Sequence, residues 1–334
     1  MGWLVKYLLF NLNTGSGIEY VGNVISKWIN EKINNDKFME YKSQTNESST
    51  INEIIKFSPD VIIINEIYPR IISPVFYYKK FNPSTKIILL AHSQNSLVMP
   101  NENSDPHLMN QYIFLMGLVG LCDKIFILDN KPFESKYNVS VKFCPSEPEL
   151  FYNKTPWNER KRDFCFISNI HDLKLSKLFL ENITQTKINI DVYGEIIKKF
   201  TKNEEYWRLF NNACQNNLNY KNVIPQEDIG SVLNDYKYLL MPHDGKETFC
   251  MILQQSIMCG TIPLLLNDEK LSGWNPIWAN GLYHGIEDVY SYINNLKLIN
   301  ENKPDEGMNS LFISEEIKKR QDYNEFKKEF KELL

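Results

Sequence analysis

The sequence lacks paired cysteines, an excess of positive charge and any apolar run long enough to span a membrane. Its six cysteines are scattered without a CxxC pair, so we predict reduced thiols in a cytoplasmic protein and no zinc site. The net charge of -4 argues against a protein whose whole surface binds nucleic acid. Residues 1–15 become polar too soon for a membrane span and contain no small-residue cleavage site, so no transmembrane segment is predicted.

What the chain does contain is abundant apolar sequence arranged in short runs. Its 334 residues are 43% hydrophobic and 13% aromatic, which indicates a folded globular protein with enough chain for two domains. Short aliphatic runs alternate with segments of helical periodicity along most of the length. This alternation predicts an α/β fold with parallel sheets.

The most informative stretch runs from Tyr238 to Leu266. An apolar run at Tyr238–Met241 predicts a buried strand, a polar loop follows from Pro242, Thr248–Cys259 has helical periodicity, and Ile262–Leu266 predicts a second strand. A loop that enters a helix at the carboxyl end of a parallel strand is suited to bind an anion, because free backbone N–H groups and the helix dipole both point at it. A carboxylate in this turn, Glu247, is better suited to the hydroxyl groups of a ligand than to its phosphate.

Two segments of this stretch, Glu247–Phe249 and Gln255–Pro263, resemble the donor-site signature of GT-B glycosyltransferases of family 4. In that signature two glutamates are separated by seven residues, and the second is Gln255 in this chain. The resemblance implies that Glu247 lies near the donor sugar and that Gln255 binds the nucleotide ribose. An amide can bond a diol, though without charge-assisted strength. The resemblance also assigns donor contacts to four neighbours of Glu247, namely Gly245, Lys246, Thr248 and Phe249.

The resemblance extends to the loop after an earlier strand, residues 163–168. In family 4 this loop commonly carries an arginine and a lysine that hold the donor diphosphate. Lys174 matches the lysine, but Asn169 stands where the arginine would be, and an arginine fork bonds two oxygens at once. We expect a neighbouring cation, Lys177 or Lys246, to compensate. The alternative for Lys174 is a solvated lysine at a helix start.

The first half of the chain supplies fewer candidates. A strand over residues 3–12 runs into a turn that contains Gly15 and Gly17 and then a helix over 18–32, where backbone can approach a ligand closely. This turn resembles the first loop of GT-B enzymes, and the alternative is a simple tight turn. It lacks the spacing of a dinucleotide-binding fingerprint, so a nicotinamide cofactor is not predicted.

His92 follows a buried strand, 86–91, and is a candidate to contact substrate. The alternative is a capping or core histidine.

The predicted fold class is α/β, and the resemblance implies the GT-B type, with two Rossmann-like domains facing a central cleft. We expect an acceptor domain over residues 1–150, a nucleotide-sugar donor domain over 151–310, and a C-terminal helix within 311–334 that packs back towards the first domain. Prolines at 145, 148 and 156 stiffen the linker. Within the second domain we also predict a short strand at 222–225 and a helix over 226–235.

The resemblance implies a glycosyltransferase, a hexosyltransferase in particular, that uses a nucleotide-diphosphate sugar. A UDP-sugar is the favoured donor, and a glycan or lipid hydroxyl is favoured as acceptor, with DNA a further candidate. The resemblance implies retention of anomeric configuration, with Glu247 and His92 as the catalytic residues. No cofactor and no metal are predicted, because lysines and a helix N-terminus can neutralise the leaving diphosphate. The sequence indicates no oligomeric state.

Two alternatives remain at this point. One is an inverting DNA base glucosyltransferase of the phage or viral type, which needs a carboxylate base on the first domain, with Glu66 or Asp105 as candidates. The other is a non-catalytic protein that binds a sugar nucleotide or carbohydrate, suggested by Gln255 and Asn169 at positions where the signature has charged residues.

Overall fold

The chain forms two compact units. A computed structural model describes residues 5–11, 17–33, 37–41, 47–66, 69–92, 115–128, 138–142, 145–199, 201–242, 251–266, 289–301 and 322–334. One unit comprises Met1–Pro145 together with Asp322–Leu334, and the other comprises Ser146–Gln321. Among the described residues, no helix is both long enough and apolar enough to cross a membrane.

The first unit is built on a parallel sheet of six strands in the order β2-β1-β3-β4-β5-β6. The strands are β1 (Tyr7–Phe10), β2 (Phe38–Tyr41), β3 (Val61–Asn65), β4 (Lys86–Ala91), β5 (Lys124–Leu128) and β6 (Val139–Lys142). The central strands are buried along nearly their whole length. This is why they read in the sequence as continuous aliphatic runs, since a parallel sheet is covered on both faces.

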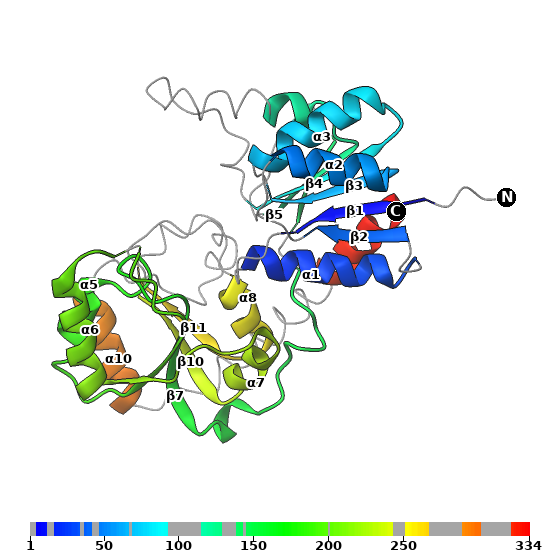
Figure 1. Ribbon diagram of the computed structural model, residues 1–334. Coiled ribbons are helices and arrows are strands. Elements are labelled where there is room, and N and C mark those ends of the chain that lie inside the picture. The colour runs from blue at the N-terminus through cyan, green and yellow to red at the C-terminus, as the bar shows by residue number, and fades with distance from the viewer. Residues whose placement is uncertain are drawn as a thin grey trace. The chain divides into compact units, whose positions relative to one another are not determined.

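Helices cover both faces of this sheet (Figure 1). Helix α1 (Gly17–Asn30) lies on one face, and α2 (Glu47–Phe57) and α3 (Pro69–Phe81) lie on the other. One apolar stripe of α1 is buried, and Trp28, near the C-terminal end of the helix, is fully buried. Residues 115–119 form a further helical segment.

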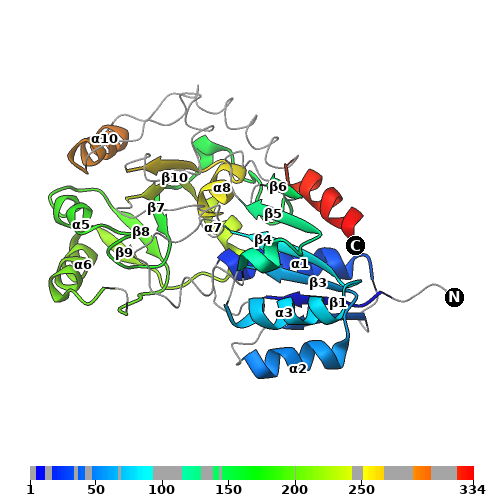
Figure 2. The same cartoon turned by 90° about the horizontal axis from the view of Figure 1, so that it is seen from above.

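The C-terminal helix, residues 322–333, packs on the α1 side of the same sheet, beside β5 and β6 (Figure 2). Trp28 donates an indole hydrogen bond to the Tyr323 hydroxyl at 2.9 Å, and its ring lies against those of Phe326 and Phe330. Glu329 forms ion pairs with two lysines at the edge of the sheet, Lys124 at 2.8 Å and Lys142 at 2.7 Å. The last helix is thus part of the core of the first unit.

The second unit has a parallel sheet of five strands in the order β11-β10-β7-β8-β9. The strands are β7 (Arg162–Ile167), β8 (Ile190–Tyr193), β9 (Leu218–Tyr220), β10 (Tyr236–Met241) and β11 (Ile262–Leu265). One face carries α5 (Lys177–Ile183), α6 (Glu204–Asn216) and α10 (Val289–Glu301), and the other carries α7 (Ile229–Leu233) and α8 (Met251–Met258) (Figure 1).

Two local predictions differ from the structure, and two elements were not predicted. The strand predicted at 222–225 is wrong: the edge strand is β9, which ends at Tyr220, and Asn222 has φ +68°, a left-handed conformation that no strand continues through. The helix predicted over 226–235 is a 3-10 turn, Gln226–Asp228, followed by the short α7. Neither β2 nor α3 was predicted, because β2 has only four half-buried residues and α3 contains Pro74.

The strand orders determine where a ligand can bind. In an open parallel sheet the binding crevice lies outside the carboxyl ends of the two neighbouring strands from which the chain winds in opposite directions. In the first sheet these strands are β1 and β3, and in the second they are β7 and β10. The residues that follow these four strands are therefore the candidates for function.

Candidate functional site

In the first unit, polar residues line the carboxyl edge of four neighbouring strands. Glu40 is in β2, Asn11 follows β1, Asn65 ends β3 and His92 follows β4. Asn11 is 1% exposed and Asn65 is fully buried. Polar groups buried this deeply require hydrogen-bond partners.

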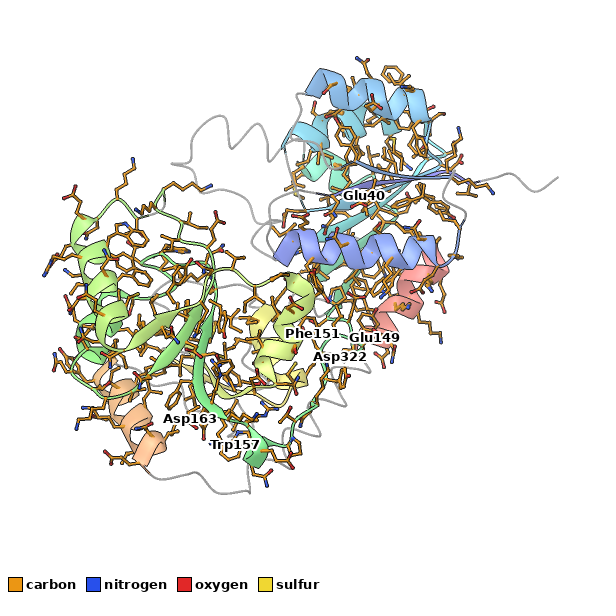
Figure 3. The ribbon with its side chains drawn as sticks, turned by 60° about the horizontal axis from the view of Figure 1, so that its bottom comes forward. Glu40, Glu149, Phe151, Trp157, Asp163 and Asp322 are labelled. Carbon is orange, nitrogen blue, oxygen red and sulfur yellow. The ribbon has the colours of Figure 1, made fainter. Side chains whose placement is uncertain are left out.

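These side chains satisfy one another. The Asn65 amide nitrogen donates to Asn11 Oδ1 at 3.0 Å and to the Ile18 carbonyl at 2.7 Å, and Asn65 Oδ1 lies 2.8 Å from His92 Nε2. The Asn11 amide nitrogen in turn donates to Glu40 Oε1 at 2.8 Å. Glu40 lies on the α1 side of the first sheet (Figure 3), where it also accepts a hydrogen bond from Ser26 at 3.2 Å. We call Glu40, Asn11, Asn65 and His92 the edge network.

A glycine in α1 makes room for the edge network. A Cβ at Gly22 would lie 1.9 Å from Asn11 Oδ1, so no other residue fits while Asn11 keeps its position. Glycine within a helix costs roughly 1 kcal/mol relative to alanine, and the close approach of Asn11 explains why the helix contains one here. Sequence reasoning missed Asn11, Glu40 and Gly22; the available signals were a polar residue directly after a buried strand and a glycine in mid-helix.

Two features at this edge of the first sheet bear on chemistry. Desolvation lowers the pKa of His92 to about 3, so its imidazole is neutral at physiological pH and keeps one ring nitrogen as an acceptor. Glu66, the residue after Asn65, has φ +84°, a strained conformation for a residue with a side chain. Such strain clusters at functional sites. Asp105, the other carboxylate considered as a base, lies outside the described residues.

In the second unit the loop after β7 passes the switch point. Asn169 is exposed and Lys174 is half-buried, and the loop is tied down because the Ile170 N–H donates to the Glu195 carbonyl at 2.8 Å. Gly194 has φ +144°, and a Cβ there would lie 1.8 Å from the Ser168 carbonyl oxygen. Any side chain at position 194 would therefore collide with the backbone that follows β7.

The cation named as a substitute for the missing arginine is engaged elsewhere. Lys177 Nζ lies 2.8 Å from Glu205 Oε2 in α6 and 3.8 Å from Glu181 in its own helix. Lys177 is therefore paired with two carboxylates at an exposed site. Lys246, the other candidate, lies outside the described residues.

Helix α8, which follows the switch-point strand β10, buries two glutamines. Gln255 is 2% exposed, and its Nε2 has no hydrogen-bond partner among the described residues. Gln254 is 1% exposed, and its Oε1 lacks a partner within the same part of the chain. A buried amide donor without a partner is destabilising by roughly 1–3 kcal/mol, so an oxygen brought by a ligand to Gln255 would recover that free energy.

Of the remaining predicted site residues, one lies among the described residues. Gly17 is the first residue of α1. The others lie outside the described residues, namely Gly15, Gly245, Lys246, Glu247, Thr248 and Phe249. Of the predicted candidates, the structure brings His92 into the edge network and places Asn169 and Lys174 in the loop after β7. Among the described residues no group of three or more His, Cys, Asp or Glu side chains is arranged to hold a metal ion.

Comparisons with known proteins give no family by sequence: no protein-family model and no curated protein matches the chain. Solved structures do match. Alr3699/HepE from Anabaena, in complex with UDP and glucose, is similar with a TM-score of 0.67 at 11% identity, covering 96% of this chain and 95% of that one. Sucrose-phosphate synthase from Thermosynechococcus elongatus gives 0.71 at 8% identity, with 98% and 99% covered.

Two further structures show how far this likeness reaches. A glycosyltransferase from Rickettsia africae ESF-5 gives a TM-score of 0.69 at 11% identity, with 98% of each chain covered. A UDP-GlcNAc 2-epimerase from Methanocaldococcus jannaschii gives 0.55 at 9% identity, with 90% and 94% covered. At these identities the likeness establishes the fold, and the predicted GT-B fold class, with two parallel α/β domains, is confirmed. Function has to be argued from the sites.

Proposed function

We propose that this protein is a glycosyltransferase that moves a sugar from a nucleotide-diphosphate donor, a UDP-sugar in the favoured case, to a hydroxyl acceptor. The observation that carries the proposal is the buried amide of Gln255, which has no partner for Nε2 among the described residues and lies on the helix after a switch-point strand. Gln255 also occupies the ribose-binding position of the family 4 signature. A fold shared with HepE, whose structure holds UDP and glucose, supports this assignment.

In this proposal the second unit binds the donor and the first binds the acceptor. Lys174 neutralises the diphosphate, Asn169 donates a neutral hydrogen bond where an arginine fork would give two, and Glu247 lies near the sugar. Transfer retains the anomeric configuration and proceeds without a metal, because the loop cation and the backbone N–H groups at the start of the α8 helix stabilise the leaving charge. His92, on the edge network, contacts a hydroxyl group of the sugar or of the acceptor.

The test compares Gln255 with its neighbour Gln254, which lies in the same helix and is equally buried. Thermal unfolding is measured with UDP, GDP, ADP and their sugars, without metal and then with magnesium. A ligand at a hundredfold its dissociation constant adds ~2.7 kcal/mol, which is a rise of a few degrees. We expect one base to be preferred, and we expect Gln255→Met to weaken its binding ~10-fold, the worth of one lost hydrogen bond.

Gln254→Met is the matched control and should leave nucleotide affinity within a factor of two. Both substitutions replace a buried amide by an apolar side chain, so the unfolding temperature of either ligand-free variant should not fall below that of the parent by more than a degree or two. Equal loss of affinity in both variants would reject Gln255 as the ribose ligand. No response of the parent to any nucleotide would reject the proposed function and favour a carbohydrate-binding protein.

Glu66 gives one specific reason to keep an inverting mechanism as second candidate. Its left-handed backbone directly follows Asn65, at the switch point of the first sheet. A carboxylate base at this position would activate the acceptor hydroxyl. NMR of the product anomer decides between the two: a retained linkage supports the family 4 mechanism, and an inverted linkage lost in Glu66→Gln supports Glu66 as base.

A further inference from the structure

The edge network is bounded by groups whose hydrogen-bonding role cannot be reversed. At one point Asn65 meets the Ile18 carbonyl at 2.7 Å, and a backbone carbonyl can only accept. At the far end Asn11 meets the carboxylate of Glu40 at 2.8 Å, and an ionised carboxylate can only accept. The two amides between them therefore have their orientation determined by their partners.

The orientation of Asn65 follows directly. Its NH₂ group must face Ile18, and the same group also donates to Asn11 Oδ1 at 3.0 Å. A flipped amide would place two oxygens 2.7 Å apart and leave both without a proton. Asn65 Oδ1 consequently faces His92, at 2.8 Å from Nε2, and an amide oxygen can only accept. The proton of the neutral imidazole must therefore reside on Nε2.

We propose that Asn65 is a positioning residue that holds His92 as the Nε2–H tautomer, so that Nδ1 accepts a hydrogen bond from a sugar hydroxyl group. The part that concerns the ligand rests on the proposed function, and the part that concerns the tautomer does not. The edge network suits this role because it is rigid at its centre, where Asn11 and Asn65 are buried, while His92 keeps part of its surface exposed.

The donor and acceptor roles within the edge network determine which hydrogen bonds His92 can make to a ligand. With its Nε2–H occupied by Asn65, the ring can accept from a hydroxyl but has no second proton to donate. A hydroxyl that donates to Nδ1 keeps its own oxygen lone pairs available for other partners. This arrangement selects a ligand with hydroxyl donors, such as a sugar, over one that offers only acceptors, such as a phosphate.

The first measurement is the imidazole nitrogen spectrum of the full chain labelled with ¹⁵N-histidine, at neutral pH and without ligand. His92→Gln assigns the resonances of His92 among the five histidines. We expect one protonated nitrogen at Nε2, one bare nitrogen at Nδ1, and an Nε2–H proton that exchanges slowly with water. A protonated Nδ1, or a mixture of tautomers, in the parent protein would overturn the proposal.

Two variants separate positioning from simple packing. Asn65→Leu removes the acceptor, so the two nitrogen shifts of His92 should move towards each other as the tautomers exchange, and the slow proton should disappear. Asn23→Ala removes an exposed partner of the same network, the acceptor 3.1 Å from Asn11 Nδ2, and should leave both nitrogen shifts unchanged. An unchanged His92 spectrum in a folded Asn65→Leu would overturn the role of Asn65. The spectrum of the parent decides the tautomer even if that variant does not fold.

The ligand part is tested by adding UDP-glucose, or whichever nucleotide sugar raises the unfolding temperature. We expect the Nδ1 shift to move towards the protonated value while Nε2 stays unchanged. If the nucleotide sugar binds and Nδ1 does not move, the assignment of Nδ1 to a sugar hydroxyl is wrong while the proposed function stands. If no nucleotide sugar binds, the proposed function fails, and the ligand-free spectrum alone decides the tautomer.

Discussion

Replacing Gly22 by alanine tests whether the edge network is as rigid as its hydrogen bonds indicate. On helix propensity alone, the substitution in mid-helix should stabilise the protein by roughly 1 kcal/mol. The new Cβ, however, would lie 1.9 Å from Asn11 Oδ1 and 2.2 Å from Asn11 Cγ. Either the Asn11 side chain moves or α1 moves away from the sheet.

The sign of the effect depends on what Asn11 loses when it moves. Its side chain accepts from Asn65 at 3.0 Å and donates to Glu40 at 2.8 Å, and it is 1% exposed, so water cannot replace both partners. Loss of two buried hydrogen bonds, at roughly 1–3 kcal/mol for each group left unsatisfied, outweighs the gain in propensity. We expect a net destabilisation of about 2–4 kcal/mol.

Urea unfolding of Gly22→Ala, Asn11→Ala and the double variant measures this. Asn11→Ala removes the atoms that clash, so alanine at 22 should destabilise that background by at least ~1 kcal/mol less than it destabilises the parent. An increase in stability of Gly22→Ala in the parent, or strict additivity of the two substitutions, would show that Asn11 moves without loss and that the edge network is not rigid.

Three further predictions concern His92, Glu329 and Arg160. The folded pKa of His92, about 3, lies below its usual 6.5, so the folded chain binds fewer protons and stability falls as the pH drops below about 6.5. Between pH 6.5 and 5.5, His92→Gln should lose ~1 kcal/mol less than the parent, and equal losses in unfolding titrations would contradict the shift. Burial opposes ionisation of Glu329, but hydrogen bonds from two lysines and a serine lower its pKa to about 2, so Glu329→Gln should be destabilised by ~2 kcal/mol at neutral pH. That difference should vanish as the pH falls from about 5 to 2, whereas Glu332→Gln, at an exposed position, should match the stability of the parent at neutral pH. Arg160 is 4% exposed and bonds Tyr236 O at 2.6 Å and Thr261 Oγ1 at 2.8 Å, so Arg160→Met should lower stability by ~3 kcal/mol, and a loss below ~1 kcal/mol would mean that water satisfies the freed acceptors.

The strands and helices that form the two cores could be predicted from the sequence. The aliphatic run at Val61–Asn65 and the stripe around Trp28 in α1 are local patterns whose period alone indicates burial. Elements with weak local patterns could not be predicted in this way. Strand β2 is only half-buried, and α3 contains a proline. The turn after β9 was misread because the left-handed φ of Asn222 is not encoded by its apolar neighbours.

For the candidate site, the sequence determined the residue types: Asn65 and His92 at strand ends in the first unit, and in the second Asn169 after β7 and Gln255 within α8. It did not determine which of them meet. Asn11 and Glu40 become neighbours of Asn65 and His92 because β2 and β1 precede β3 and β4 in the order of the sheet. Strand order results from long-range pairing and from the packing of helices on both faces, which no local window of sequence records. For that reason the donor and acceptor roles in the edge network were decided by the tertiary structure alone. The same holds for the ring nitrogen of His92 that carries the proton.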